Sequence, residues 1–166
     1  MKKLLLLFSL LAFITINVSA QENYAIGLRA GGTSGLTFRM ITSSGSEFEG
    51  IAGFWNHGVS VTALYKKRNN AFDVNGLNWI YGGGGHVSHY GAKFNRNNEP
   101  YWHTNYPTYV DYTTFGFGID GLVGMEYKIP KIPVAVSFEF KPFFEVISNG
   151  DVWVSMDPGL GIKFVF

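Results

Sequence analysis

The sequence predicts an all-β fold, an eight-stranded antiparallel up-and-down transmembrane β-barrel that follows a cleaved signal peptide. Three observations lead to this prediction. An apolar segment opens the chain, and apolar residues then alternate with small or polar ones in eight separate stretches. The composition is also unusual, with 21 Gly and 17% aromatic residues but only 15% charged residues. This balance suits strands in an apolar setting better than surface helices.

Residues 1–20 have the organisation of a secretory signal peptide. Lys2 and Lys3 give a basic start, residues 4–18 are almost wholly apolar, and small residues end the segment at Ala20. The apolar run is shorter than the ~20 residues that a membrane-spanning helix needs. We therefore expect cleavage after Ala20, which leaves residues 21–166 as a single barrel domain.

No amphipathic helix pattern follows the signal segment, whereas a period of two recurs. In each stretch one face carries Tyr, Trp, Phe, Val, Ile and Leu. The other face carries Gly, Ser, Thr and nearly all of the charged residues. The predicted strands cover residues 24–31, 35–40, 48–54, 59–66, 79–88, 119–128, 134–141 and 159–166.

The connections between these strands differ in length. Short turns are expected at 31–34, 43–47, 55–58, 130–133 and 148–151, a medium loop at 68–76, and one long loop at 92–113. An even number of strands brings both chain ends to the periplasmic end of a barrel. The long loop then lies at the cell-surface end, and the short turn between Pro130 and Pro133 lies at the periplasmic end, as in outer-membrane barrels.

Alternation alone does not say which face points inward, because a soluble barrel has an apolar interior and a membrane barrel an apolar exterior. The polar face is rich in small residues, which suits a narrow interior. Tyr24, Trp79, Tyr81 and Tyr127 lie near strand ends, as in the aromatic belts of membrane barrels. The chain also ends on an alternating strand with a terminal Phe166. An outward apolar face is therefore predicted; a soluble secreted barrel that binds an apolar ligand stays as an alternative.

Residues 77–86, residues 118–128 and the last strand carry a family resemblance. The chain resembles the small eight-stranded bacterial outer-membrane barrels of the OmpX/OmpA transmembrane type, and it is similar to uncharacterised small barrels of Bacteroidetes. The resemblance implies an outer-membrane location, outer-membrane lipid as a partner, and a barrel-insertion machinery that recognises Phe166. It implies no catalytic residues. We therefore expect a monomeric, non-enzymatic protein with an envelope-structural or surface-interaction role.

The polar face places charged side chains of both signs inside the predicted barrel. An eight-stranded barrel is just wide enough for its own side chains, and an isolated buried charge is very costly. The sequence therefore predicts a structural network of ion pairs, with a selectivity-lined pore as the alternative. The predicted members are Arg29, Arg39, Glu49, Lys66, Asp120, Glu126, Lys128, Glu139, Lys141 and Lys163, with Glu145 as a further candidate.

His86 and Ser88 form the most enzyme-like pair in the sequence. Two residues apart on a strand, they share a face, so that an imidazole could activate the hydroxyl. Some small outer-membrane barrels are lipid A deacylases with a His-x-Ser motif followed by Asn. Here His89 replaces that Asn, and the alternation turns both side chains inward, away from a lipid substrate. We interpret the pair as part of the polar interior, and a lipid A-modifying hydrolase as the alternative.

No other chemistry is indicated. The chain has no Cys, and His57, His89 and His103 are scattered without metal-ligand spacing. The glycines at 82–85 lack the Lys and the following helix of a phosphate-binding loop, and we expect them to serve close side-chain packing inside the barrel. A net charge of +1 gives no basic surface for nucleic acid. We expect no metal, no cofactor and no nucleic-acid partner.

The long loop at 92–113 is rich in aromatic residues. Tyr and Trp supply large amphipathic contact areas, so this loop could bind a surface ligand. The same residues are favoured where a loop rests on the membrane interface, and that reading stays open. The candidate contact residues are Tyr101, Trp102, Tyr106, Tyr109 and Tyr112.

Overall fold

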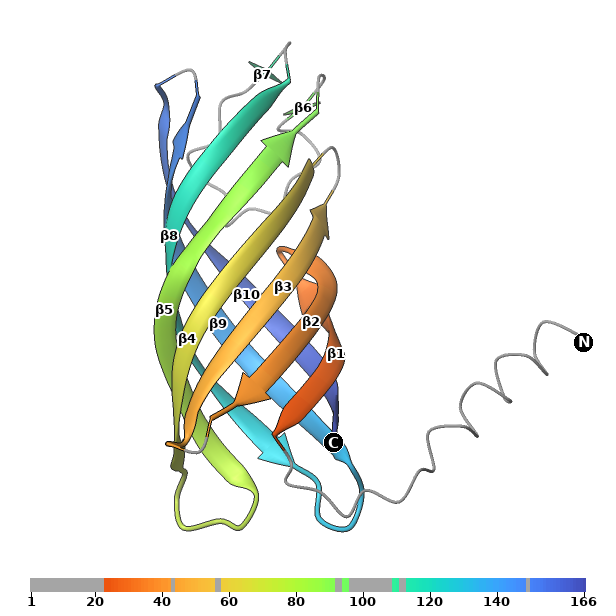
Figure 1. The fold of residues 1–166 in the computed structure, drawn as a ribbon. Coiled ribbons are helices and arrows are strands. Elements are labelled where there is room, and N and C mark those ends of the chain that lie inside the picture. Colours follow the sequence, from red (N-terminus) through yellow and green to blue (C-terminus); the bar gives the residue numbers. More distant parts are fainter. Residues whose placement is uncertain are drawn as a thin grey trace, which may run out of the picture.

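The computed structural model describes residues 23–42, 44–55, 58–91, 94–95, 109–110, 113–148 and 150–166. Eight antiparallel strands close into a barrel, as the sequence predicted (Figure 1). The barrel strands are β1 (Tyr24–Gly31), β2 (Ser34–Ile41), β3 (Ser46–Trp55), β4 (Gly58–Asn70), β5 (Leu77–Tyr90), β8 (Thr114–Lys128), β9 (Val134–Ile147) and β10 (Val152–Val165). The expected signal segment, residues 1–20, lies outside the described residues.

Each barrel strand pairs with its neighbour along the chain, and β1 pairs with β10 to close the sheet. At the closing seam Ala25 faces Val165 in the register. Just beyond it, Tyr24 and Phe166 exchange two backbone hydrogen bonds, of 2.9 and 2.8 Å. Every barrel strand therefore has a neighbour on both sides, which removes the exposed edges that an open sheet would have.

The two ends of the barrel differ (Figure 1). Tyr24 and Phe166, which begin and end the barrel segment of the chain, lie at the same end of the barrel, which we call the terminus end. The turn around Lys131 lies there too. The opposite, distal end carries the two short strands β6 (Phe94–Asn95) and β7 (Tyr109–Val110), which pair with each other. This arrangement agrees with an even strand count and a long loop away from the termini.

Several strands are longer than the alternation predicted. The last strand begins at Val152 rather than at residue 159, and β9 continues to Ile147 instead of ending at residue 141. Pro142 and Pro158 lack an N–H, so each removes one possible sheet hydrogen bond. The register nevertheless continues through both prolines, with Met156 opposite Pro142 and Pro158 opposite Phe140. The alternation of faces continues with it.

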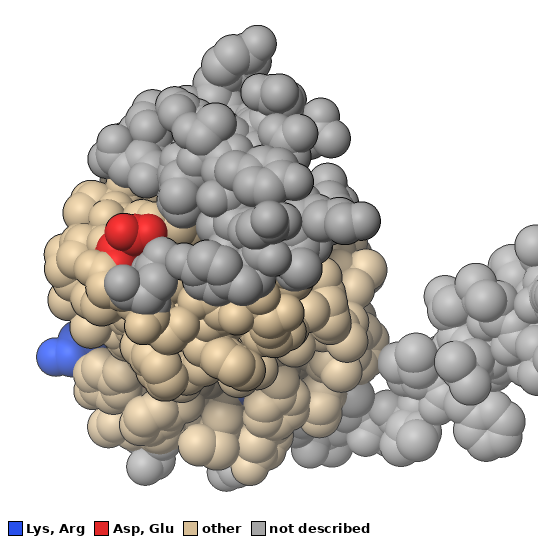
Figure 2. Space-filling view, turned by 90° about the horizontal axis from the view of Figure 1, so that it is seen from above, with Lys and Arg blue, Asp and Glu red and all other residues tan. Residues whose placement is uncertain are grey.

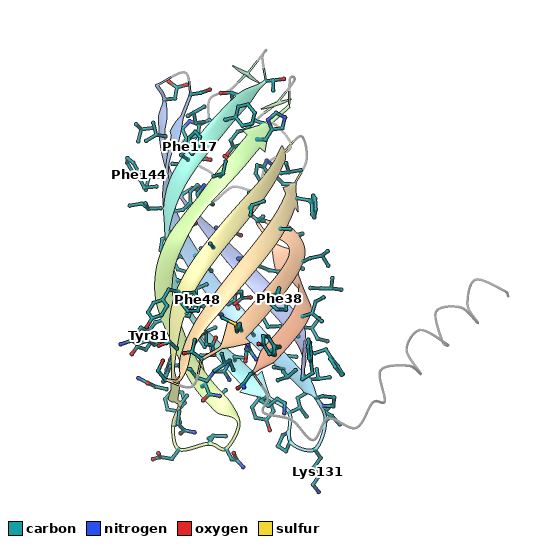
Figure 3. All side chains as sticks on the ribbon, viewed as in Figure 1. Phe38, Phe48, Tyr81, Phe117, Lys131 and Phe144 are labelled. Atoms are coloured by element: carbon teal, nitrogen blue, oxygen red, sulfur yellow. The ribbon has the colours of Figure 1, made fainter. Side chains whose placement is uncertain are left out.

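Apolar side chains cover the outside of the barrel. Val61 and Ile119 are each 68% exposed, and Leu160 is 63% exposed. From the side, the labelled Phe117 and Phe144 project from the wall (Figure 3), and from above charged side chains interrupt the described surface at few points (Figure 2). Of the two orientations left open by the alternation, the apolar-outward one is the one observed.

Aromatic rings gather on the outer surface toward the terminus end, where Phe38, Phe48 and Tyr81 are labelled in Figure 3. Tyr24 stacks on Phe38, with ring centroids 6.2 Å apart. Phe48 packs against Tyr65, whose hydroxyl lies 2.8 Å from the Ser46 hydroxyl. Aromatic rings, of which Tyr24, Tyr65 and Tyr81 carry a hydroxyl, therefore gather on this part of the wall.

Candidate functional site: the charged barrel interior

The inward positions of the strands hold a continuous interior ion-pair network. Its members are joined through N–O contacts of 4 Å or less, and they come from every barrel strand. The network contains Arg29 (β1), Arg39 (β2), Glu47 and Glu49 (β3), Lys66 and Arg68 (β4), His86 (β5), Asp120 and Glu126 (β8), Glu139, Lys141 and Glu145 (β9), and Asp157 and Lys163 (β10).

At the terminus end the network is built around two carboxylates. Arg68 donates from Nε to Glu47 over 2.5 Å and from Nη2 to Glu126 over 2.6 Å. Arg39 also donates to Glu126, over 2.5 Å. Lys66 lies 3.4 Å from Glu47 and continues the network toward the distal end. Apart from Arg68, whose side chain is 20% exposed, these groups are shielded from solvent.

Lys163 lies at the centre of the network. Its Nζ is 2.9 Å from Glu49, 3.1 Å from Glu139 and 3.5 Å from Glu126. The Glu49 carboxylate also accepts hydrogen bonds from Lys66 and from the Thr37 hydroxyl. A single ammonium therefore joins carboxylates from three strands, β3, β8 and β9.

Two cations link the centre to the distal half. Arg29 lies 3.7 Å from Glu139 and 3.0 Å from Asp157. The Asp157 carboxylate also accepts a 2.9 Å hydrogen bond from the Thr33 backbone N–H, which fixes it to the β1–β2 turn. Lys141 then joins Asp157, at 3.6 Å, to Asp120, at 2.9 Å.

His86 and Glu145 end the network toward the distal end. His86 Nδ1 is 2.8 Å from Asp120, and its Nε2 is 3.3 Å from Glu145. Glu145 accepts two more hydrogen bonds, one from the Ser88 hydroxyl and one of 2.6 Å from the Tyr90 hydroxyl. The carboxylate at this end is thus surrounded by donors.

Beyond His86 the interior becomes apolar. Tyr90, Phe143, Ile147 and Trp153 form a buried cluster, and Trp55 packs against it. The Phe143 ring lies 5.4 Å from the His86 ring in an edge-on arrangement. We call these five residues the aromatic cap; it separates the ion-pair network from the distal end of the barrel.

The buried interior combines the charged network with apolar side chains, including a cluster of Ile51, Leu64, Ile80 and Leu122. Burying an unpaired ion is very costly, and only close pairing with satisfied hydrogen bonds offsets that cost. The network meets much of this condition, because carboxylates such as Glu49, Glu126 and Glu145 each contact two or more donors. Arg29 Nε, Arg39 Nε and Glu47 Oε2, in contrast, are buried without a hydrogen bond. The interior of an eight-stranded barrel is just wide enough for side chains, so paired charges of this kind take up interior space.

The structure brings together most of the residues that the sequence singled out. Arg29, Arg39, Glu49, Lys66, Asp120, Glu126, Glu139, Lys141 and Lys163 all belong to the network, as does the further candidate Glu145. Lys128 is the last residue of β8 and is half-buried.

Sequence reasoning missed four members of the network. Glu47 and Arg68 were expected in connections, yet they belong to β3 and β4. Asp157 was missed because the last strand was started too late. His86 was placed inside but not among the ion pairs. The period of two continues through Glu47 and Asp157, so extending the alternation past the predicted boundaries could have found them.

The geometry gives no support to Ser88 as a nucleophile. Its hydroxyl donates to Glu145 instead of to His86, and the side chain is 2% exposed inside the barrel. An activated serine needs a base that accepts its proton, and His86 Nε2 is directed at the same Glu145 oxygen. Among the described residues no group of three or more His, Cys, Asp or Glu side chains could hold a metal ion.

The glycines of β5 serve a close approach of backbone, which corrects the expected side-chain packing. A side chain at Gly82 would meet the Tyr65 carbonyl, and one at Gly84 would meet the Ala63 carbonyl. Both carbonyls belong to β4. The glycines therefore let β4 and β5 lie close where the sheet curves.

The long-loop candidates are largely beyond the described part of the chain. Tyr101, Trp102, Tyr106 and Tyr112 lie outside the described residues, as do His57 and His103. Tyr109 is described as the first residue of β7, where it pairs with Asn95. The expected surface contact of this loop stays a prediction.

No protein-family model, no curated protein and no solved structure matches this chain. Within the described ranges, no helix is long and apolar enough to cross a membrane. What the chain does is therefore inferred from the two faces of its barrel.

Proposed function

We propose that the chain is an integral outer-membrane protein whose β-barrel spans the membrane, with the terminus end on the periplasmic side. The observation that carries this proposal is the distribution of polarity across the wall. Exposed apolar side chains such as Val61, Ile119 and Leu160 cover the outside, and buried ion pairs fill the inside. This is the arrangement expected of a membrane barrel.

Physical considerations favour lipid as the surroundings of this wall. Soluble proteins rarely expose large continuous apolar surfaces, because water solvates them poorly. A closed barrel satisfies its backbone hydrogen bonds internally, as hydrocarbon requires. The aromatic rings near Tyr24 and Tyr81 suit the interface between lipid and water, where rings with polar tips are favoured. A soluble carrier of an apolar ligand would need the opposite distribution, with an apolar cavity inside.

Within the membrane, the role we propose is structural or adhesive and not enzymatic. Charged groups of the interior are engaged with one another, and Ser88 is engaged with Glu145. The partners implied are outer-membrane lipid along the wall and the barrel-insertion machinery during assembly. We propose a monomer, and the loop at 92–113 as the segment that meets surface ligands.

Fractionation of cells with a heat-shift gel tests the location. The protein is expected in the outer-membrane fraction, to require detergent for extraction, and to migrate faster unheated than boiled. Recovery from the soluble periplasm without detergent would refute the proposal.

A matched pair of variants sharpens this test. Val61→Arg introduces a charge on the outside of the wall, which should cost about 2–4 kcal/mol near the middle of a bilayer. Asn69→Arg changes an exposed polar residue near the end of β4 and should cost little. Folding into lipid vesicles, followed by urea titration, compares them. Equal stability of the two variants would argue for an aqueous exterior.

A further inference from the structure

The charges of the interior ion-pair network balance only if His86 is counted among the cations. Arginine and lysine supply six positive charges, from Arg29, Arg39, Lys66, Arg68, Lys141 and Lys163. The carboxylates supply seven negative charges, from Glu47, Glu49, Asp120, Glu126, Glu139, Glu145 and Asp157. Among these described members of the network, the carboxylates outnumber the Arg and Lys side chains by one if His86 is not counted, and a surplus buried negative charge is costly in a closed interior.

The position of the His86 ring agrees with this count. Nδ1 lies 2.8 Å from Asp120 Oδ2, and Nε2 lies 3.3 Å from Glu145 Oε1. A neutral imidazole has one N–H and one lone pair, so one of its nitrogens would face a carboxylate oxygen without a proton between them. A ring with both protons donates to both carboxylates.

We propose that His86 is an imidazolium that completes the charge balance of the network and clamps β5 to β8 and β9, so that loss of its proton loosens the distal end of the barrel. The clamp joins Asp120 on β8 to Glu145 on β9, directly beneath the aromatic cap. The protein thereby contains a pH-sensitive element. This inference concerns the barrel interior and does not depend on the membrane location.

The groups that face His86 define what its proton must balance. Asp120 comes from β8, and Glu145 comes from β9 with the hydroxyls of Ser88 and Tyr90 donating to it. Lys141 on β9 already contacts Asp120, and through Asp157 it reaches β10. On β4 the residue opposite His86 is Thr62, which carries no charge. Within the described part of the chain, two carboxylates thus face the ring, and a single lysine contacts one of them.

The sign of the pH effect follows from the clamp. The imidazolium interacts favourably with two carboxylates in the folded barrel, and these contacts are absent from the unfolded chain. The stability that it contributes is therefore complete where an unfolded histidine is protonated and the two carboxylates are still ionised, and it is lost as the pH rises and the folded protein releases this proton.

Three variants of the detergent-folded full chain test the charge count by urea titration at neutral pH. His86→Gln leaves one surplus carboxylate and should raise the unfolding equilibrium constant about 100-fold or more. Glu145→Gln alone leaves one surplus cation and should also lower the urea midpoint. The double variant His86→Gln/Glu145→Gln restores the balance, so its midpoint should exceed that of His86→Gln. A neutral His86 predicts the reverse, with Glu145→Gln more stable than wild type and His86→Gln almost unchanged.

A measurement on the wild-type protein keeps the proposal falsifiable if a variant does not fold. NMR of the ¹⁵N-histidine-labelled chain in detergent micelles, compared with His86→Gln or His86→Asn for assignment, reports protonation at each ring nitrogen. We expect a histidine with both nitrogens protonated at neutral pH, and a coupled loss of the second proton and of Trp153 burial at alkaline pH. A neutral His86 ring at pH 7 would overturn the proposal.

Discussion

Lys163 is the residue on which the interior depends most, because three carboxylates surround its ammonium group. Lys163→Met should leave Glu49, Glu126 and Glu139 with too little positive charge, and removing one partner of a buried pair costs about 3–5 kcal/mol. Urea unfolding in detergent measures this loss.

The matched control is Lys67→Met on the outside of β4, where the side chain is exposed. A surface substitution of this kind changes stability by about 0.5 kcal/mol or less. If both lysines gave the same small loss, the interior network would contribute far less to stability than its geometry implies.

At the scale of strands, the approach of β4 to β5 depends on glycine. Gly84→Ala would push a methyl group against the Ala63 carbonyl of β4, and overpacking of this kind costs about 1–3 kcal/mol. Gly50→Ala is the control, since a side chain there meets nothing within 4 Å. The control should be neutral or up to about 1 kcal/mol more stable, because alanine restricts the unfolded chain. Thermal unfolding of both variants gives the comparison, and a stable Gly84→Ala barrel would contradict the close approach.

The strands also show how far the sequence could predict the structure. A period of two assigns each residue to a face, and that assignment placed Arg29, Glu49 and Lys163 inside together. Which inward residues meet depends on register and on the curvature of the closed sheet, and neither is encoded in the period. The contact of Arg39 with Glu126, 87 residues apart, is therefore visible only in the structure. Strand ends were predicted least well, so Asp157 was missed.

Phe166, the residue after β10, allows an effect on folding to be measured separately from an effect on assembly in cells. Phe166 stacks on Tyr24 at 6.1 Å, is 38% exposed, and exchanges backbone hydrogen bonds with Tyr24. Phe166→Ala keeps those bonds and loses a partly exposed ring, which should cost less than the ~1.5–3 kcal/mol of a fully buried one. Refolding in detergent should therefore change little. If the insertion machinery recognises the terminal aromatic, outer-membrane levels in cells should fall several-fold for Phe166→Ala and for deletion of Phe166.

Phe138→Ala, an outward ring elsewhere on the wall that is 57% exposed, controls for general loss of apolar surface. Outer-membrane fractions from cells that produce equal amounts of each variant give the measurement. An equal fall for both variants would show that Phe166 acts through its apolar area and not as a recognised terminus. Failure of Phe166→Ala to refold in detergent would give the residue a structural role instead.

For the molecule as a whole, polarity is inverted relative to a soluble domain. Charged side chains make up much of the core, and apolar side chains cover much of the surface. A charged core specifies a fold only when each ion finds a partner, because an unpaired one would attract water or prevent closure. The network from Arg68 near one end to His86 near the other meets this requirement by drawing on all eight strands. The ion pairs are therefore complete only when the barrel is closed.

The same filling of the interior predicts that the barrel conducts little or no current. The network occupies the centre, with Lys163 2% and Glu126 1% exposed, and the aromatic cap around Trp153 closes the distal side. An ion entering this interior would have to separate charges that are already paired with one another, at a large electrostatic cost. Planar-bilayer recordings of the purified protein should show no stable openings, while a wide porin recorded under the same conditions should show them.

Trp153→Ala, which opens the cap but leaves the network intact, should stay closed as well. Stable porin-like openings in the wild type would mean that the ion pairs line a passage instead of filling the barrel, and openings in Trp153→Ala alone would assign the barrier to the cap.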